Sequence, residues 1–293
     1  MGKIKQTKIF IGFVLPFLCC SICCQGMNLA ISQKDQVVLK KFWQYAKEQR
    51  LEQLSMQERI PIIATFFLNT PYQGNTLNVD LEEKLVINLQ ALDCVTFVEN
   101  VLALALLYDY QSSCESQFMN NLQAIRYRQG KIEDYSSRLH YSSDWLYDLQ
   151  QRHLVQDVTA QIGGSSFQPN VFYMSKYYES YPQLQNDTAL VKKMEQIEMM
   201  INQRTLYYIP KMKVAQTYHK IEHGDILLIT TNIKGLDTSH LGFAYKKQGI
   251  VYLLHASSTA KKVVLSAQPL EEYMSNIRSQ TGIMVGRIVL RPQ

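Results

Sequence analysis

The chain lacks several features that would assign it to other classes of protein. Its 293 residues contain no internal repeat and no low-complexity tract, so a repeat architecture is not expected. No run of Lys and Arg is interleaved with aromatic residues, so a formal net charge of +5 gives no reason to expect nucleic acid as a partner. Three of these charges, on Lys3, Lys5 and Lys8, lie within the first 26 residues, which leaves +2 for the rest of the chain.

The longest apolar run lies at the N-terminus. It covers residues 9–24, is interrupted by Pro16 and gives way to the polar pair Gln25-Gly26. It is shorter than the roughly 20 apolar residues that a membrane-spanning helix needs. A basic start followed by such a run is typical of an export signal. We therefore expect residues 1–26 to be a signal peptide and the protein to be exported to the periplasm or cell envelope, with a short uncleaved anchor as the alternative.

Cysteine is scarce outside this segment. Four of the six cysteines lie within it, at positions 19, 20, 23 and 24. Lipoprotein processing favours a small residue directly before the modified cysteine, and none of the four has one. A lipid anchor is therefore an alternative that the sequence does not favour.

Removal of the signal would leave Cys94 and Cys114. We predict a helix from Cys94 towards Tyr110, which at 1.5 Å per residue would span roughly 24 Å and keep the two thiols beyond disulfide reach. We therefore expect Cys94 to be free and Cys114 to be an ordinary, partly buried thiol.

The predicted secondary structure changes from mainly helical to mainly β-strand near residue 204. Periodicity and capping patterns predict helices over residues 32–51, 55–67, 94–110, 115–127, 143–153 and 189–203. Short β-rich runs follow at residues 206–209, 225–230, 241–245, 251–255, 262–265 and 283–290, with a short helix at 269–278. Residues 83–92 look extended, residues 161–186 look like an irregular insertion, and Gln248-Gly249 predicts a hairpin turn.

This order predicts an α+β fold with a helical half over residues 32–203 and a β-rich half over residues 205–293. Each half carries only part of the candidate site described next. We therefore expect the halves to be two lobes of a single catalytic domain, residues 27–293.

The most informative stretch is Asp93-Cys94-Val95-Thr96-Phe97-Val98-Glu99, at the start of a predicted helix. Asp93 is placed to cap that helix. A cysteine in the first turn faces unpaired N–H groups and the positive end of the helix dipole, so we expect ionisation of Cys94 to be favoured. The alternative, a buried structural cysteine, carries equal weight from position alone. Glu99 lies off the face of Cys94 and is expected to be structural.

Two histidines follow in strand-like segments, His240 and His255. Adjacent antiparallel strands would bring them side by side, so that His255 could bind the His240 ring and set its tautomer. Taken singly, His240 is more often a structural residue than a base. Together with Cys94, the order of the three suggests a cysteine hydrolase of papain-like architecture that acts by acyl transfer.

No metal or cofactor is expected. His219 and His223 have a spacing that invites a zinc interpretation, but they lie in a linker without a cysteine or an acidic residue placed to complete a site.

Several segments together resemble one bacterial family. They are Asn69-Thr70-Pro71-Tyr72, Gly74-Asn75-Thr76-Leu77, Leu92-Asp93-Cys94, Arg138-Leu139-His140-Tyr141, Asp144-Trp145, His223-Gly224-Asp225-Ile226, Gly235-Leu236-Asp237-Thr238-Ser239-His240-Leu241-Gly242 and Leu254-His255-Ala256-Ser257. In this order they resemble the N-acetylmuramoyl-L-alanine amidase-like branch of the NlpC-type cysteine peptidases. The resemblance extends from about Phe66 to Arg287.

The resemblance implies a papain-like fold with a triad of Cys94, His240 and His255. It also implies cleavage of the amide between the lactyl group of N-acetylmuramic acid and L-alanine in peptidoglycan fragments, including 1,6-anhydro muropeptides, in cell-wall turnover or recycling. Two alternatives are an endopeptidase that cuts within the stem peptide and a non-catalytic envelope protein that binds peptidoglycan. No membrane partner is implied beyond the signal or a lipid anchor.

The same resemblance suggests residues that bind substrate. Tyr72 corresponds to a tyrosine that lies beside the nucleophile in the wider superfamily. Arg138, His140 and Tyr141 could contact a sugar or a peptide carboxylate, or could equally form a cluster that packs the lobes together. Asp237 and Ser239 flank His240 and could orient it or line the cleft.

Overall fold

The computed structural model describes residue 2 and residues 31–107, 109–110 and 115–289. Apart from residue 2, the expected signal peptide lies outside the described residues, and so does Cys114. Within the described ranges, no helix is long and apolar enough to cross a membrane.

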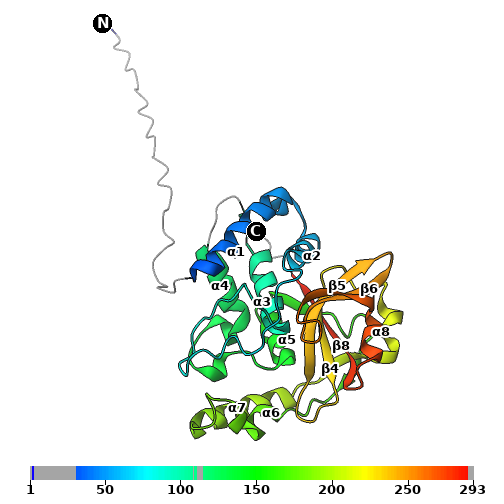
Figure 1. Cartoon of the computed structure of the whole chain (residues 1–293). Coiled ribbons are helices and arrows are strands. Elements are labelled where there is room, and N and C mark those ends of the chain that lie inside the picture. The colour runs from blue at the N-terminus through cyan, green and yellow to red at the C-terminus, as the bar shows by residue number, and fades with distance from the viewer. Residues whose placement is uncertain (1, 3–30, 108, 111–114, 290–293) are drawn as a thin grey trace.

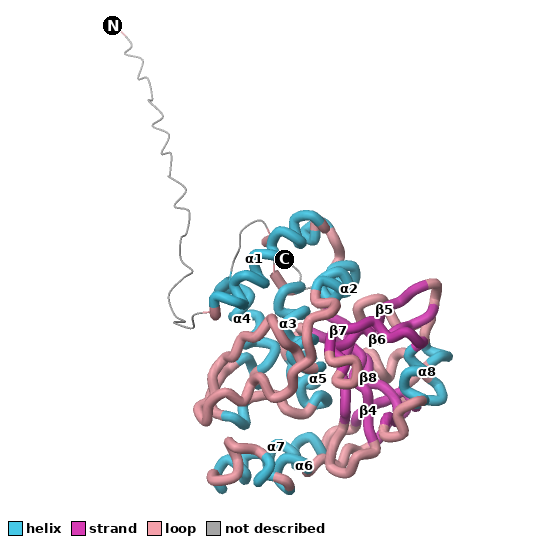
Figure 2. Tube along the Cα trace, viewed as in Figure 1, coloured by secondary structure: helices cyan, strands magenta, loops and turns pink. Residues whose placement is uncertain are grey.

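Helices and strands occupy largely separate parts of the molecule (Figures 1 and 2). The α-helices are α1 (Gln33–Glu48), α2 (Met56–Phe66), α3 (Cys94–Ala105), α4 (Glu115–Arg126), α5 (Ser142–Gln151), α6 (Tyr173–Lys176), α7 (Thr188–Asn202) and α8 (Leu270–Ser275). The strands are β1 (Val155–Asp157), β2 (Ser165–Phe167), β3 (Leu206–Pro210), β4 (Ile226–Thr231), β5 (Thr238–Lys247), β6 (Ile250–Ser257), β7 (Lys262–Pro269) and β8 (Gln280–Ile288). Helices α1 to α5 gather on one side of the strands, and α8 lies on the other. The fold is therefore α+β, as predicted.

The strands form one antiparallel sheet in the order β2-β3-β8-β4-β5-β6-β7, and β1 pairs with β8 as well. The boundary predicted near residue 204 is too sharp, because β1 and β2 precede it and still join the sheet. Strands of three residues carry too little alternation to give a periodic signal. The two halves of the chain thus share one sheet.

Two helices begin at serine caps, and the second of them, at Ser55, follows from the capping pattern in the sequence. The Ser32 hydroxyl accepts a hydrogen bond from the Asp35 N–H at 3.1 Å at the start of α1. Ser55 and Glu58 form a capping box at the start of α2, with the Ser55 N–H donating to Glu58 Oε2 at 2.9 Å. Each such cap stabilises its helix by about 1 kcal/mol, so local chemistry fixes these starts.

Helix α3 packs on the sheet and thereby positions the candidate site. Every residue from Thr96 to Ala105 is buried. The Phe97 ring packs edge to face on Phe243 of β5, with the centroids 5.7 Å apart. Burial of one such ring contributes about 1.5–3 kcal/mol, which holds α3 firmly against β5. Leu270 and Met274 of α8 pack into the separate apolar cluster on the other face of the sheet.

The turn between β5 and β6 is the predicted hairpin. Gln248 and Gly249 have φ angles of 51° and 81°. Two successive positive φ angles are the signature of a type I′ turn, whose twist matches that of the flanking strands. The register that follows pairs Phe243 with Leu254 and so aligns the segments that carry the two histidines.

Two interpretations of the sequence need correction. Residues 83–92 form no strand; within them Leu92 makes an isolated bridge with Tyr72, and the Leu89 N–H donates to the Asp35 carboxylate at 2.8 Å. Leu85, Leu89 and Leu92 of this segment are buried in the main apolar cluster, to which helices and strands both contribute, and this burial is why the segment resembles a strand. Residues 161–186 are not wholly irregular, since they contain β2 and α6.

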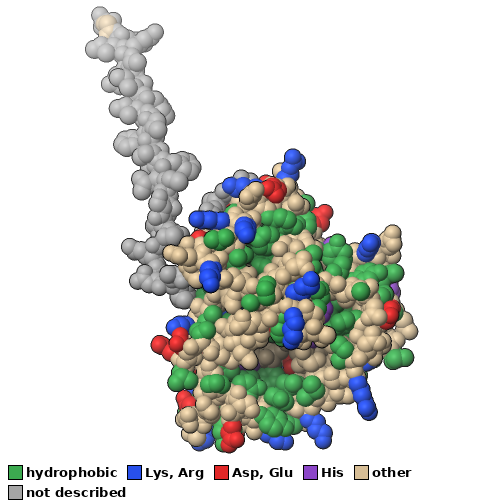
Figure 3. All heavy atoms as spheres, viewed as in Figure 1, with side chains coloured by type: hydrophobic (Ala, Val, Ile, Leu, Met, Phe, Trp, Pro, Cys, Tyr) green, Lys and Arg blue, Asp and Glu red, His purple; other side chains and the backbone are tan. Residues whose placement is uncertain are grey.

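The surface drawn in Figure 3 has no single charged patch. Basic and acidic side chains are scattered over it, and a hollow bordered by hydrophobic side chains opens in its lower half.

Candidate active site

Cys94 is the first residue of helix α3. The Asp93 carboxylate accepts a hydrogen bond from the Thr96 N–H at 2.8 Å, and the Asp93 N–H donates to the Thr96 hydroxyl at 2.9 Å. This reciprocal cap fixes the backbone on both sides of Cys94, so the helix start determines where the thiol points. Cys94 is a free cysteine, as the sequence predicted.

The electrostatics at Cys94 differ from the expectation that the helix start favours a thiolate. Burial of the thiol, and after it the negative charge of Asp93, raises the pKa of Cys94 to about 12. The N–H groups of Leu241, Cys94 and Val95 act in the opposite direction and do not outweigh the loss of solvation. The cysteine is therefore a neutral thiol at neutral pH, and its reaction as a nucleophile requires a base.

His240 is placed by an irregularity in strand β5. It pairs with Ile229 of β4, whereas the next residue of β4, Thr230, pairs with Thr238. Ser239 is therefore left without an opposite residue, as in a β-bulge, and it is exposed. A bulge turns the adjacent side chains away from the regular alternation, and here the residue that follows it is His240.

Leu241 connects the two halves of the site. Its backbone N–H lies close enough to the Cys94 sulfur to act on the pKa of the thiol. The ladder between β5 and β6 ends at the pair Phe243–Leu254, so at Leu241 the position beside β5 is open to another partner. Because Leu241 directly follows His240, this proximity places the imidazole and the thiol in one neighbourhood.

His240 and His255 are hydrogen-bonded to each other. His240 Nε2 lies 2.6 Å from His255 Nδ1, and the two rings are nearly perpendicular at 89°, with their centroids 4.8 Å apart. One proton must lie between these nitrogens. When His240 Nε2 carries it, His240 Nδ1 keeps a free lone pair that can accept the thiol proton. The hydrogen bond between the two rings agrees with the pairing that the sequence suggested, and through it His255 can set the tautomer of His240.

Gly242 makes the room that this pair of rings requires. A Cβ atom at position 242 would lie 2.7 Å from the carbonyl oxygen of Leu254 and 3.0 Å from the Cβ of His255. Real side chains do not tolerate contacts of 2.7 Å with backbone. The close approach of β5 to β6 beside the histidines therefore depends on glycine.

Both imidazoles are neutral in the folded protein. Burial lowers the pKa of His240 to about 4. Burial, and after it the electrostatic effect of the adjacent His240, lowers the pKa of His255 to about 3. The resting state is thus a thiol beside a neutral imidazole rather than a thiolate–imidazolium pair. Of the two roles considered for His240, general base and ion-pair partner, these pKa values favour the first.

Tyr72 lies beside the nucleophile. Burial raises the pKa of its hydroxyl, and the proximity of Cys94 and Asp93 adds to the effect, which requires both groups to be close. The backbone holds it there, since the Tyr72 N–H donates to the Lys261 carbonyl at 2.9 Å and Tyr72 forms a bridge with Leu92. This position agrees with the one that the family resemblance implied.

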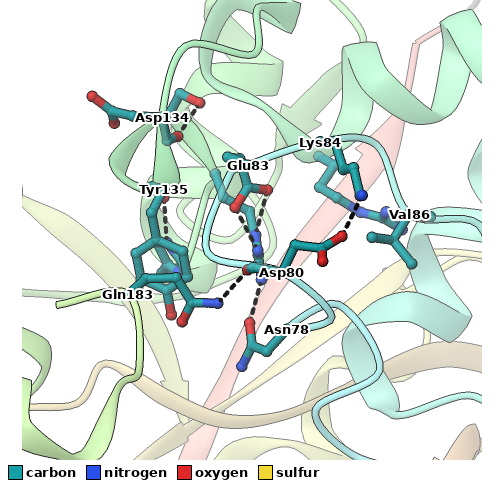
Figure 4. A network of polar contacts seen from close by, with 12 residues as sticks. Asn78, Asp80, Glu83, Lys84, Val86, Asp134, Tyr135 and Gln183 are labelled. Atoms are coloured by element: carbon teal, nitrogen blue, oxygen red, sulfur yellow. Dashed lines mark hydrogen bonds and ion pairs between the residues drawn. The ribbon is translucent and has the colours of Figure 1, made fainter. Parts of the chain in front are cut away.

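Arg138 belongs to a polar network that holds the loop between Tyr72 and Cys94 in place. Figure 4 labels its partners Glu83 and Asn78 in that loop. Its guanidinium donates to both carboxylate oxygens of Glu83, at 2.6 and 3.0 Å, and to the Asn78 side chain at 3.0 Å. Glu83 is almost fully buried and also accepts from the Tyr127 hydroxyl at 2.6 Å. These contacts favour the packing interpretation of Arg138 over direct contact with substrate.

His140 and Tyr141 also have structural partners. The His140 Nε2 lies 2.8 Å from the Tyr135 carbonyl oxygen, and burial lowers the pKa of His140 to about 3. The Tyr141 hydroxyl donates to Glu198 of α7 at 2.6 Å, and the pKa of that hydroxyl is raised by burial. Tyr141 thereby ties the start of α5 to α7, which again favours packing.

Asp237 anchors the start of β5 rather than contacting the His240 ring. Its carboxylate accepts hydrogen bonds at 2.7 Å from the N–H of Ser143, in the first turn of α5, and from that of Thr238. Burial raises the pKa of Asp237, and these donors partly offset that effect. Ser239 remains exposed beside His240, where it can line the cleft.

Tyr273 and Gln280 were missed by the sequence interpretation. The Tyr273 ring packs edge to face on His255 with the centroids 5.2 Å apart, and burial and the proximity of Cys94 raise the pKa of its hydroxyl. That hydroxyl is hydrogen-bonded to the side chain of Gln280, which is buried. Neither residue lies in a recognisable motif, because α8 and β8 bring them to the histidines only through tertiary packing.

Other candidate groups have structural roles. Glu99 is buried and its carboxylate accepts from Arg126 at 2.7 Å, consistent with the structural role expected for it. His223 Nδ1 accepts from the Lys246 N–H at 2.9 Å. Across the described ranges, no group of three or more His, Cys, Asp and Glu side chains could hold a metal ion.

Comparison with known proteins identifies the family. A family model described as N-acetylmuramoyl-L-alanine amidase-like matches residues 62–283. The chain belongs to this family. None of the curated proteins gives a match.

Solved structures agree with this assignment. A structure of an N-acetylmuramoyl-L-alanine amidase from Bacteroides uniformis has 40% sequence identity and a TM-score of 0.77, and the match covers 80% of this chain and 99% of that one. A Bacteroides fragilis protein, named as a proposed xylanase, has 41% identity and a TM-score of 0.74 over 77% of this chain and 99% of that one. A Legionella pneumophila protein with 23% identity and a TM-score of 0.63, over 88% of this chain and 96% of that one, shares the fold.

Proposed function

We propose that the protein is a cysteine amidase that hydrolyses the amide between N-acetylmuramic acid and L-alanine in peptidoglycan fragments. One arrangement carries the proposal: Cys94, at the start of α3, lies close to Leu241, the residue that follows His240, and His240 is hydrogen-bonded to His255. Membership of the amidase-like family supports the reaction class and the peptidoglycan-derived substrate. We assign the fold to the papain-like NlpC type on the same grounds.

The first half of the reaction forms a thioester. His240 Nδ1 takes the proton of the Cys94 thiol while the sulfur attacks the lactyl carbonyl carbon, whose oxygen becomes an oxyanion. Collapse of this intermediate breaks the carbon–nitrogen bond, and His240 gives its proton to the departing amine of L-alanine. Because His255 occupies Nε2 of His240, Nδ1 is the nitrogen that takes up this proton and releases it.

The second half releases the sugar. Water attacks the thioester carbonyl, His240 accepts a proton from it, and the carbon–sulfur bond breaks to regenerate the Cys94 thiol and a free lactyl carboxylate. The N–H groups of Cys94 and Val95 lie near the sulfur, at the unpaired start of α3, and act to lower the pKa of the thiol. Such donors can stabilise an oxyanion by about 3–4 kcal/mol each.

The substrate belongs to cell-wall turnover or recycling, and 1,6-anhydro muropeptides are our specific candidates. Residues 1–26 serve as an export signal in this proposal, which places the enzyme where such fragments form.

The test is incubation of the purified protein with anhydro-muropeptides, followed by mass spectrometry of the products. We expect the free sugar and a peptide that begins with L-alanine. A sugar that retains a dipeptide would identify an endopeptidase instead, and unchanged substrate would identify a binding protein. Cys94→Ala should abolish turnover while the far-UV circular dichroism stays unchanged; full activity in this variant would refute the cysteine mechanism.

A further inference from the structure

The ring of His255 borders a cavity into which it could turn. The cavity has a volume of about 500 Å³, and both His255 and Tyr273 line it. Strand β6 fixes the backbone of His255, which pairs with Val264 of β7. The strand does not by itself fix the ring, because the second side-chain torsion of histidine has broad, roughly two-fold minima. The orientation of the ring therefore depends on its neighbours.

This orientation decides whether the two histidines are hydrogen-bonded. His255 Nδ1 lies 2.6 Å from His240 Nε2. Half a turn of the His255 ring about its Cβ–Cγ bond would put the carbon Cδ2 where Nδ1 now lies, and a C–H group cannot accept the His240 proton. Rotation of the ring into the cavity would also remove the acceptor. A contact that holds the His255 ring therefore maintains the tautomer of His240.

Tyr273 supplies such a contact. Its ring centroid lies 5.2 Å from that of His255, with the two planes at 72°, which is the edge-to-face geometry that aromatic pairs favour. The His240 ring also packs on His255 edge to face, so His255 contacts a ring on each of these two residues. Burial raises the pKa of the Tyr273 hydroxyl, so the phenol is neutral and acts on His255 by packing rather than by charge.

Helix α8 holds Tyr273 in this position. Leu270, Tyr273 and Met274 have the spacing i, i+3, i+4 and so share one face of the helix. Leu270 and Met274 are fully buried in the apolar cluster on this face of the sheet. The first turn of α8 is attached as well, because the Glu271 N–H donates to the Tyr218 hydroxyl at 3.1 Å. Tyr273 is therefore carried by an anchored helix.

We propose that Tyr273 is a positioning residue for the histidine pair: its ring holds His255 so that Nδ1 stays directed at His240 Nε2. Tyr273 acts through His255, and this role requires its ring and not its hydroxyl. The proposal deepens the proposed amidase function and rests on it, because only the transfer of a proton by His240 makes the orientation of His255 matter for kcat.

The test measures kcat and KM with an anhydro-muropeptide in variants that remove the ring or the hydroxyl. We expect Tyr273→Leu to lower kcat about 3- to 10-fold, the range that an aromatic edge-to-face contact supplies, with KM unchanged within about twofold. Tyr273→Met, which fills more of the volume without a ring, takes its place if Tyr273→Leu does not fold. Tyr273→Phe keeps the ring, so both values should stay within about twofold of wild type.

Tyr218→Phe is the control for a general weakening of α8. It removes the hydroxyl that accepts from the Glu271 N–H and leaves the ring of Tyr273 in place. This variant should unfold at a lower temperature and keep kcat within about twofold of wild type.

A double variant shows whether Tyr273 acts through His255. His255→Ala has no ring to orient, so the addition of Tyr273→Leu should lower kcat by less than about a further twofold. The same fold loss in both backgrounds would show an effect independent of His255. Equal losses in Tyr273→Phe and Tyr273→Leu would assign the effect to the hydroxyl. Either result, or an unchanged kcat in Tyr273→Leu, would overturn the proposal.

NMR separates this inference from the proposed reaction. If the wild-type protein cleaves no muropeptide, the proposed function fails, and the inference is decided by the ring ¹⁵N shifts of His240 and His255, which report the nitrogen that carries each proton. We expect Tyr273→Leu to move these shifts towards values averaged over the two tautomers, and Tyr273→Phe and Tyr218→Phe to keep the wild-type shifts. Unchanged shifts in Tyr273→Leu, or the same displacement in either of the other variants, would refute the role of the ring.

Discussion

Replacement of His255 by alanine tests the central hydrogen bond of the proposed mechanism. The substitution removes the acceptor 2.6 Å from His240 Nε2 and leaves a buried N–H without a partner. An unsatisfied buried donor costs about 1–3 kcal/mol, which corresponds to about 5- to 150-fold in an equilibrium between ring orientations. Because His240 acts in both halves of the reaction, this loss should appear in kcat rather than in KM.

We therefore expect His255→Ala to lower kcat by about 10- to 100-fold with a muropeptide substrate, at a temperature where the variant is still folded. His255→Asn is the matched control, because its side-chain oxygen can accept the same N–H. It should recover most of the lost kcat. A kcat in His255→Ala within twofold of wild type, or equal losses in the two variants, would refute the role assigned to this hydrogen bond.

Further predictions concern pH and buried charge. The pKa of His240, lowered to about 4, predicts that kcat/KM falls on the acid side near pH 4 rather than near the ordinary histidine value of 6.5, which a pH–rate profile measures. His140 has a pKa lowered to about 3, so the unfolded state binds more protons between pH 6.5 and 3 and stability is lost as pH falls through this window. His140→Gln should reduce the slope of unfolding free energy against pH by about 1.4 kcal/mol per unit there, as measured by urea unfolding. Arg138→Met should destabilise the fold by about 3–5 kcal/mol because it leaves Glu83 buried and unpaired, and the double variant with Glu83→Gln should recover much of that loss; unfolding curves that show no recovery would contradict the pairing.

The sequence predicts the parts of the fold that depend on local chemistry. The capping box at Ser55 and the hairpin turn at Gln248 and Gly249 each follow from a few neighbouring residues, and each agrees with the structure. The α+β class follows from the change in periodicity along the chain.

What the sequence does not reveal depends on tertiary contacts. Residues 83–92 look like a strand because they are rich in apolar residues, and Leu85, Leu89 and Leu92 among them are buried in a core to which helices and strands both contribute. The thiol of Cys94 was expected to ionise because of the helix start, and the desolvation that reverses this effect comes from the packing of the whole site. Tyr273 reaches His255 from a helix that carries no motif.

In the candidate site, too, some residues can be predicted from local sequence and others depend on tertiary contacts. Cys94, His240 and His255 can be selected from residue type and spacing, and the hydrogen bond between the histidines agrees with that selection. The partners of Arg138 and Tyr141, Glu83 and Glu198, lie far away along the chain. The sequence alone therefore does not distinguish substrate contact from packing for these two residues.

The position of strand β8 in the sheet has a consequence for how the chain folds during synthesis. It is the last described strand to be synthesised, yet it lies between β3 and β4 and also pairs with β1. Until Gln280–Ile288 has emerged, three earlier strands have no neighbour on that side, and their free edges are open to association with other chains. Nascent molecules halted before residue 280 should therefore be prone to aggregation and proteolysis until the sheet closes.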